Sequence, residues 1–292
     1  MDNLAAKLRW GTAQRLEFIE FRLFWDGELN RGEIVEKFGV SVPQASNDLS
    51  LYQQQAPGNL QYDASRKCYV PTLNFVPRFL TPNADRYLVQ LKAIADRVIG
   101  LGDTWIVEPP DADAMPIPAR RVEPRMLKFF LEAIRGHRSI HIHYHSMNDS
   151  RPDALWRWVT PHAFGFDGLR WHVRGFCHLD RAFKDFILSR CLEVREQGEP
   201  AAKPEDDNQW STFFEVELAP NPKLSAAQQK TIALDYGMKC GRMTVSVRYA
   251  LLYYFNKRLR LDVAEKQDRP KETPIIVANR REFEKALKRV VT

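Results

Sequence analysis

The sequence predicts an α+β protein of several domains: a winged helix-turn-helix, a small antiparallel β-barrel and a small C-terminal α+β domain. Three patterns support this fold class. Three helix patterns with short turns fill residues 12–52, four strand patterns fill residues 139–194, and strands and helices alternate from residue 213 onward. At 292 residues the chain is long enough for two or three hydrophobic cores.

The composition is that of an ordinary globular protein, with 44% hydrophobic and 27% charged residues. No apolar run approaches the length of a membrane span, and the first residues lack the pattern of a signal peptide. The four cysteines are too widely spaced for a metal knot: Cys68, Cys177, Cys191 and Cys240. We therefore expect a cytoplasmic protein with reduced thiols, no membrane contact and no cofactor.

The first two helices have clear end signals. The pattern predicts a helix over residues 12–26, with Thr12 as its N-cap. A second helix begins near Asn30, where Glu33 completes a capping box, and it ends at Gly39.

The third helix, residues 41–52, has the polarity of a DNA-recognition helix. Ala45, Leu49 and Tyr52 share one face for packing. Short amide and hydroxyl side chains occupy the other face, where they can bond to base edges in a major groove. A hairpin around residues 63–66 follows, and cations at its tip can contact phosphates as a wing does. The expected DNA-binding residues are Ser41, which also caps the helix, Gln44, Ser46, Asn47, Ser50, Arg66 and Lys67.

The alternative interpretation of this region is a helical bundle followed by an unrelated hairpin. We favour DNA binding because the order of the elements, their spacing and the wing agree. Charge argues against it: the whole chain has a net charge of +6, but residues 1–72 carry 8 lysines and arginines against 9 aspartates and glutamates. Phosphates must then be bound by a few well-placed cations, or by both copies of a dimer.

Residues 81–136 are predicted to connect the domains. An amphipathic helix covers residues 83–100, and its apolar face includes Leu88 and Val98. Residues 103–122 contain four prolines and are expected to form an extended linker. A further helix begins at Pro124. Neither helix can bury its apolar face alone, so we expect this region to contribute to a dimer contact.

The predicted strands of the barrel cover residues 139–147, 158–166, 169–177 and 183–194, and Asp167 followed by glycine predicts a hairpin between the second and third. Polar side chains interrupt the apolar pattern of these strands. Two arginines near a tyrosine, a serine and a histidine would bind an anion such as phosphate or carboxylate. The candidate ligand-binding residues are Tyr144, Ser146, His162, Trp171, Arg174 and Arg190. The alternative is that both arginines lie on the solvated face of the sheet.

Several motifs resemble those of the WYL-domain transcription regulators of bacteria. In the barrel they are Trp171-His172-Val173 followed by Arg174-Gly175-Phe176-Cys177, the upstream Pro161-His162, and Phe183-Lys184-Asp185-Phe186 running to Ser189-Arg190. The naming triplet differs, since His172 and Val173 stand where the family has Tyr and Leu. Asn221-Pro222-Lys223-Leu224, Asp235-Tyr236-Gly237-Met238 and Val247-Arg248-Tyr249-Ala250 resemble the branch found beside phage-defence loci of the BREX and CBASS types.

The resemblance covers nearly the whole chain and implies four parts. They are a winged helix-turn-helix (1–80), a helical linker and dimerisation region (81–136), an Sm-like or SH3-like WYL barrel (137–198) and a WCX-like C-terminal extension (208–292) that contacts the neighbouring subunit. The implied function is a homodimeric repressor of a phage-defence operon, which binds a palindromic operator in double-stranded DNA. An anionic nucleotide or oligonucleotide in the barrel would modulate DNA affinity, and no enzymatic activity is expected.

Two other functions stay open. His141, His143 and His145 alternate on one strand face, a spacing at which two imidazoles can bind one metal ion. A metal-dependent hydrolase would need a further ligand such as Asp149, Asp153 or His172, and a half-exposed strand face is the more common explanation. The other possibility is a nucleic-acid sensor without a regulatory role.

Overall fold

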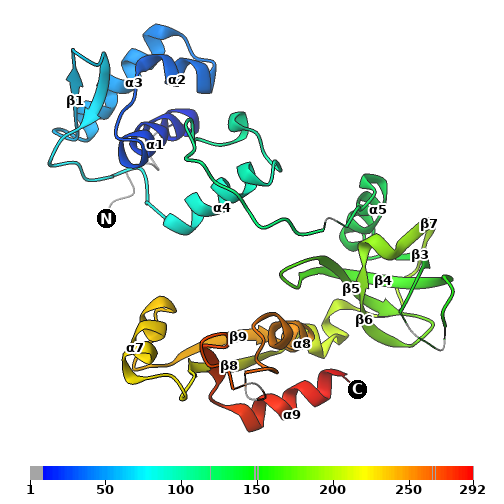
Figure 1. Cartoon of the computed structure of the whole chain (residues 1–292). Coiled ribbons are helices and arrows are strands. Elements are labelled where there is room, and N and C mark those ends of the chain that lie inside the picture. Colours follow the sequence, from blue (N-terminus) through cyan, green and yellow to red (C-terminus); the bar gives the residue numbers. More distant parts are fainter. Residues whose placement is uncertain are drawn as a thin grey trace. The chain divides into compact units, whose positions relative to one another are not determined.

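The helices and strands of the computed structural model follow the predicted order along the chain (Figure 1). The structure describes residues 9–118, 120–147, 149, 151–264, 266 and 268–291. The chain divides into an N-terminal unit (residues 1–116) and a C-terminal unit (residues 117–292). None of the described helices is long and apolar enough to cross a membrane.

The N-terminal unit has a three-helix core followed by a β-hairpin, as a winged helix-turn-helix requires. Its elements are α1 (Trp10–Trp25), α2 (Arg31–Phe38), α3 (Val42–Gln55), β1 (Leu60–Asp63), β2 (Cys68–Pro71), α4 (Ala84–Ala95) and the 3-10 turn η2 (Leu101–Asp103). The hairpin strands pair antiparallel. The three helices enclose fully buried side chains that include Leu16, Ile34 and Leu49.

The predicted end signals of α2 and α3 are confirmed. The Asn30 side chain accepts a hydrogen bond from the Glu33 N–H, and the Glu33 carboxylate accepts one from the Asn30 N–H. Gly39 then ends α2 in the left-handed region, with φ at 61°. Ser41 caps α3 by accepting a hydrogen bond from the Gln44 N–H. These local signals fix the turn between the two helices.

Two other helices have different limits from those predicted. α1 has Arg9 at its N-cap, so the prediction of Thr12 is wrong. The Thr12 hydroxyl accepts a hydrogen bond from the Arg15 side chain instead. α4 is shorter than predicted, and the predicted apolar residues Leu88 and Val98 are 57% and 75% exposed.

Part of the predicted linker belongs to the N-terminal unit. Ile106 is fully buried in a small cluster with Phe21. Lys37 Nζ donates a hydrogen bond to the carbonyl oxygen of Thr104 at 2.6 Å. The prediction of an extended linker from residue 103 is therefore wrong at its start, because apolar side chains there find a core to pack against.

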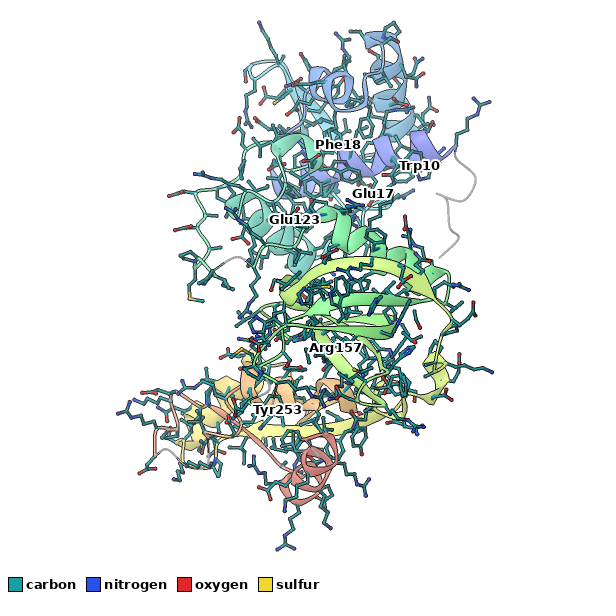
Figure 2. The ribbon with its side chains drawn as sticks, turned by 90° about the vertical axis from the view of Figure 1, so that its right-hand side faces the viewer. Trp10, Glu17, Phe18, Glu123, Arg157 and Tyr253 are labelled. Carbon is teal, nitrogen blue, oxygen red and sulfur yellow. The ribbon has the colours of Figure 1, made fainter. Side chains whose placement is uncertain are left out.

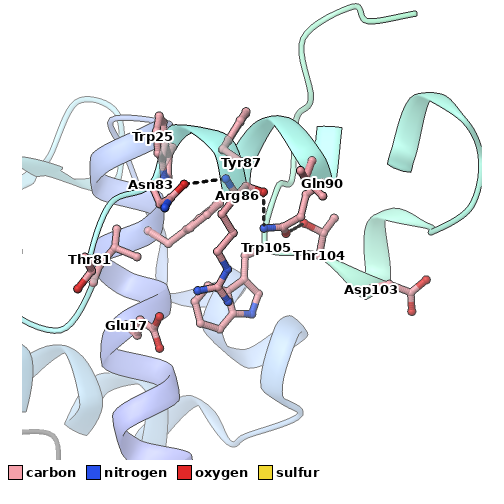
Figure 3. A pocket seen from close by; sticks show the side chains of 13 residues that line it. Glu17, Trp25, Thr81, Asn83, Arg86, Tyr87, Gln90, Asp103, Thr104 and Trp105 are labelled. Atoms are coloured by element: carbon pink, nitrogen blue, oxygen red, sulfur yellow. Dashed lines mark hydrogen bonds between the residues drawn. The ribbon is translucent and has the colours of Figure 1, made fainter. Parts of the chain in front are cut away.

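Figure 3 shows a pocket of about 440 Å³ in the N-terminal unit, where α4 and residues 103–105 meet α1. Its amide groups are already paired: Asn83 accepts a hydrogen bond from the Arg86 N–H, and Gln90 accepts one from the Thr104 hydroxyl. Its aromatic rings pack on one another, with the Trp25 ring centroid 4.7 Å from its neighbour in α4. We therefore assign no ligand to this pocket.

The first half of the C-terminal unit is a five-stranded antiparallel sheet with one helix against it. Its elements are α5 (Pro124–Arg135), β3 (Ser139–Tyr144), β4 (Leu155–Phe166), β5 (Trp171–Cys177), β6 (Ala182–Ile187), the 3-10 turn η3 (Leu188–Arg190) and β7 (Cys191–Gly198). The strand order is β6-β5-β4-β3-β7. The prediction of one strand over 183–194 is wrong, since η3 divides that segment so that β7 can pair with β3. The core includes Phe130, Ile142 and Val173.

The second half of the C-terminal unit is a small α+β domain, as predicted. Its elements are η4 (Pro204–Asp206), α6 (Asn208–Ser211), β8 (Phe213–Pro220), α7 (Ala226–Asp235), β9 (Met243–Arg248), α8 (Tyr249–Arg258), β10 (Ile275–Val277) and α9 (Arg280–Val291). The three strands form an antiparallel sheet of order β10-β8-β9. Leu252 of α8 and Phe283 of α9 are fully buried in the core of this domain.

Two glycines allow the barrel to contact the C-terminal domain closely. A Cβ on Gly165 of β4 would lie 3.2 Å from the Leu251 side chain of α8. Gly168, in the predicted turn, has a φ of 88°, and a Cβ there would lie 2.8 Å from Arg258 Nε. A larger side chain at either position would force the α8 side chain that faces it to move.

Candidate nucleic-acid interface and ligand pocket

The exposed face of α3 presents the polar side chains that the sequence predicted. Asn47 and Ser50 are exposed, whereas Gln44 and Ser46 are half-buried. The Asn47 side chain makes no hydrogen bond within the described part of the chain, so its amide NH2 donor and its amide oxygen acceptor are both available. Ser41 is exposed as well, although its oxygen is engaged in capping the helix.

The buried face of α3 fixes the direction in which that surface points. Arg15 of α1 donates two hydrogen bonds to the buried Asp48 carboxylate, at 2.6 and 3.1 Å. Gln44 donates to the same carboxylate at 3.0 Å, which limits its freedom to reach a base. Because α3 is held rigidly, its backbone loses little conformational entropy when the helix binds DNA.

One cation beside this surface was missed by the sequence analysis. Arg31, the first residue of α2, is exposed and donates a hydrogen bond to the Ser46 hydroxyl at 3.1 Å. The sequence could have indicated Arg31, because it directly follows the capping residue Asn30 and so begins the helix that precedes α3. The charge of Arg31 offsets the absence of lysine and arginine from α3.

The predicted wing forms, and its two cations differ. Arg66 makes an ion pair with Glu28, so part of its charge is neutralised. Lys67 is exposed at the tip and has a φ of 54°. Lys67 is therefore the better placed of the two to contact a phosphate.

In the barrel, three of the six predicted ligand residues line one pocket of about 300 Å³. We call it the anion pocket; its lining residues are Tyr144, Ser146, Met147, Arg151, Arg157, Asp180, Lys184, Asp185, Phe186 and Arg190. Four of these side chains are cationic and two are carboxylates, so the lining has an excess of positive charge. Tyr144 is buried and its hydroxyl accepts a hydrogen bond from the Ile187 N–H.

The most informative residue of the anion pocket, Arg157, was not predicted. It belongs to β4 (Figure 2), and its side chain is only 4% exposed. Its Nε and Nη2 atoms are buried and have no hydrogen-bond partner among the described residues. The nearest carboxylate oxygen, of Asp180, lies 3.9 Å from Nη1. A buried guanidinium with unpaired donors is costly unless an anion completes its hydrogen bonding.

Asp180 binds two of the other cations of the anion pocket, Arg151 and Lys184. It accepts hydrogen bonds from Arg151 at 2.7 Å and from Lys184 at 2.8 Å. Burial raises the pKa of Asp180, but the hydrogen bonds from Lys184 and Arg151 outweigh it and hold the pKa below its usual range. The carboxylate therefore stays charged and keeps the cations at the pocket wall.

Two other predicted residues lie in a separate cluster, which we call the clamp: His162, Arg174 and Asp207. Arg174 donates to both Asp207 oxygens, at 2.7 and 3.1 Å, and His162 Nε2 lies 3.0 Å from the same carboxylate. The prediction of one shared pocket is wrong here because side chains alternate along a strand. Val173 faces the barrel core, so its neighbour Arg174 faces the C-terminal domain.

Trp171, the sixth predicted residue, is in neither cluster. It is 55% exposed and lines an apolar hollow of about 490 Å³ with Leu127 and Leu131 of α5. Its ring packs against Phe166 at the end of β4. The structure therefore separates Trp171 from the residues of the anion pocket.

Each of the three histidines in β3 or directly after it contacts other groups of the barrel. The rings of His141 and His143 stack on tryptophans of β4, with centroids 4.8 and 5.0 Å apart. His145 Nε2 lies 2.7 Å from the carbonyl oxygen of Pro152. Across the described residues, no group of three histidine, cysteine, aspartate or glutamate side chains is placed to hold a metal ion. The geometry gives no support to the hydrolase alternative.

Three family models match successive parts of the chain. The BrxR transcriptional regulator winged helix-turn-helix domain matches residues 11–93, the WYL domain matches residues 125–196, and the BrxR transcriptional regulator C-terminal dimerization domain matches residues 213–283. The three types of domain predicted from the sequence are thereby confirmed.

Several relatives are similar over almost their whole length. The DNA-binding transcriptional repressor CapW of Stenotrophomonas maltophilia is 37% identical over 95% of this chain and 93% of its own. CapW of Escherichia coli strain KTE188 is 37% identical (96% and 93%), and CapW of Pseudomonas aeruginosa is 38% identical (94% and 91%). The chain therefore belongs to the family of WYL-domain transcription regulators that includes the CapW repressors, as its sequence motifs predicted.

Proposed function

We propose that the protein is a homodimeric transcriptional repressor of a phage-defence operon, acting in the cytoplasm on a palindromic operator. The observation that carries the proposal is the exposed polar face of α3 on a rigid three-helix core. Its relatives carry the name of DNA-binding repressors, which supports the same conclusion. Each subunit places α3 in a major groove, with Asn47 and Ser50 toward base edges.

Phosphate contacts come from cations around α3 rather than from α3 itself. Arg31 lies beside the helix and Lys67 lies at the tip of the wing. Two copies double this small number of contacts, and the resemblance of residues 213–283 to a dimerization domain supports a dimer. A twofold dimer binds half-sites whose centres are one helical turn or a multiple apart.

Replacing Asn47 by alanine is expected to weaken operator binding about 10- to 100-fold, because one bidentate base contact contributes roughly 1–3 kcal/mol. The matched control is Gln54→Ala, two turns further along the same face of α3 and beyond the end that enters the groove. Gel-shift titration of both variants measures the effect. Equal affinities of the two variants would show that Asn47 does not read the operator.

We further propose that an anionic nucleotide or oligonucleotide binds in the anion pocket and changes the affinity for DNA. The unpaired donors of Arg157 supply the strongest argument, since a phosphate oxygen would satisfy them. Arg190 and Lys184 add charge at the wall, and Tyr144 and Ser146 complete the polar lining. A ligand shifts the equilibrium between two dimer geometries only by its difference in affinity for them.

Arg157→Met is expected to lower the affinity for inorganic pyrophosphate at least about 30-fold, from the loss of roughly 2 kcal/mol or more. Methionine fills the space of the stem, and it removes a buried charge that is incompletely paired. The variant should therefore unfold at a denaturant concentration no lower than the wild type. Arg195→Met, which removes an exposed cation from β7, is the control and should bind normally. Unchanged binding in Arg157→Met would contradict the assignment of the pocket.

A further inference from the structure

One residue belongs both to the wall of the anion pocket and to the contact with the C-terminal domain. Asp185 of β6 lines the pocket. One of its oxygens accepts a hydrogen bond from Arg174 at 3.2 Å, and the other accepts one from the Tyr254 hydroxyl at 3.1 Å. Tyr254 belongs to α8, so the pocket wall and the C-terminal domain are linked through a single carboxylate.

Each partner of Asp185 is itself held in place. Arg174 is fixed by the Asp207 carboxylate of the clamp and by the Gln209 side-chain oxygen at 3.1 Å. The Tyr254 ring packs against His172 of β5, with centroids 4.8 Å apart. Burial raises the pKa of Tyr254, and the nearby Asp185 charge raises it further, so the phenol stays a hydrogen-bond donor. The carboxylate of Asp185 is the group in this chain of contacts that borders the pocket.

We propose that Asp185 couples the anion pocket to α8: an anion bound in the pocket weakens the hydrogen bond that the Tyr254 hydroxyl donates to Asp185. This inference rests on the proposed function of the pocket. A bound anion and the Asp185 carboxylate have like charges, and such a pair in a partly buried site repel each other. Movement of the carboxylate away from the anion relieves this repulsion, at the expense of its contact with Tyr254.

The coupling is reciprocal by thermodynamic necessity. If the anion weakens the contact between Asp185 and Tyr254, then loss of that contact must raise the affinity for the anion by the same factor. Tyr254→Phe removes the hydroxyl and keeps the ring that packs on His172. Tyr253→Phe is the matched control, because Tyr253 (labelled in Figure 2) is the adjacent residue of α8 and is 41% exposed, whereas the bond to Asp185 comes from Tyr254.

The experiment is calorimetric titration of the full chain with inorganic pyrophosphate at constant ionic strength. Tyr254→Phe is expected to bind pyrophosphate about fivefold more tightly than the wild type, and Tyr253→Phe to bind like the wild type. Asp185→Asn should also bind more tightly, because it removes the repelling charge. In the Asp185→Asn background, Tyr254→Phe should have no further effect.

A second measurement tests whether ligand binding loosens α8. Pyrophosphate should increase amide hydrogen exchange in α8 of the wild type and leave it unchanged in Asp185→Asn. If the wild type binds pyrophosphate and loses that binding in Arg157→Met, but Tyr254→Phe binds like the wild type, the coupling is overturned while the pocket stands. If the wild type does not bind pyrophosphate, the pocket assignment itself is overturned, and the coupling with it.

Discussion

Replacing Asp207 by alanine is expected to lower the free energy of unfolding of the C-terminal unit by about 3–5 kcal/mol, because the buried Arg174 loses two hydrogen bonds to this carboxylate and keeps a single one to a carboxylate, that of Asp185 at 3.2 Å. Asp207 is 1% exposed and Arg174 is 4% exposed. The clamp joins the barrel to the segment that leads into the C-terminal domain, so its loss also loosens their contact. Chemical denaturation followed by tryptophan fluorescence measures the effect. Glu205→Ala, an exposed carboxylate two residues earlier, is the control and should change stability little.

The same variant tests the pH dependence of the clamp. Burial raises the pKa of Asp207, but hydrogen bonds from His162 and Arg174 outweigh it and lower the pKa to about 2. A carboxyl group with a lowered pKa in the folded state contributes stability above its unfolded pKa, near 4, and loses it as the pH falls toward 2. The difference in stability between wild type and Asp207→Ala should therefore shrink between about pH 4 and pH 2. A difference independent of pH in this range would contradict the charged clamp.

Replacing Glu20 by alanine is expected to destabilise the N-terminal unit by about 3 kcal/mol or more. Glu20 is fully buried in α1. Its carboxylate accepts hydrogen bonds from the N–H groups of Arg78, Phe79 and Leu80 at 2.6–2.9 Å, and from the Tyr52 hydroxyl at 3.0 Å. Without it, three backbone donors of the segment after the wing lose their buried acceptor.

The loss of Glu20 should also reduce DNA binding, because Tyr52 is a packing residue of α3. Glu17→Ala, one turn earlier on α1 and only half-buried, is the control. Thermal unfolding and operator titration of both variants give the two effects. If both substitutions lower stability equally, the destabilisation comes from α1 in general and not from the buried carboxylate.

The local parts of the fold were predictable because their signals lie within a few residues. The capping box at Asn30, the left-handed Gly39 and the Ser41 cap each involve groups at most three residues apart, and all three form as expected. The alternation of apolar and polar residues likewise predicted the strands of the barrel. It failed at Leu188–Arg190, where a tight turn has the same apolar and polar pattern as a continuous strand.

The candidate site was less predictable because it depends on partners distant in sequence. Tyr144, Ser146 and Arg190 meet in one pocket as expected, since Arg190 directly precedes β7, which pairs with β3. Arg157 lies one residue before the predicted strand 158–166, so its buried position in β4 was not predicted. The partner of Arg174 is Asp207, 33 residues further on and beyond a connecting segment that has no motif of its own.

The central claim is specific operator binding by a dimer through α3, and footprinting of the purified protein on the DNA upstream of its own gene tests it most directly. The predicted result is two protected half-sites whose centres lie about 10.5 base pairs or a multiple apart. Affinity should exceed that for random DNA at least about 1,000-fold and should fall steeply with salt. Equal affinity for random DNA, or protection of a single half-site by one subunit, would contradict the account.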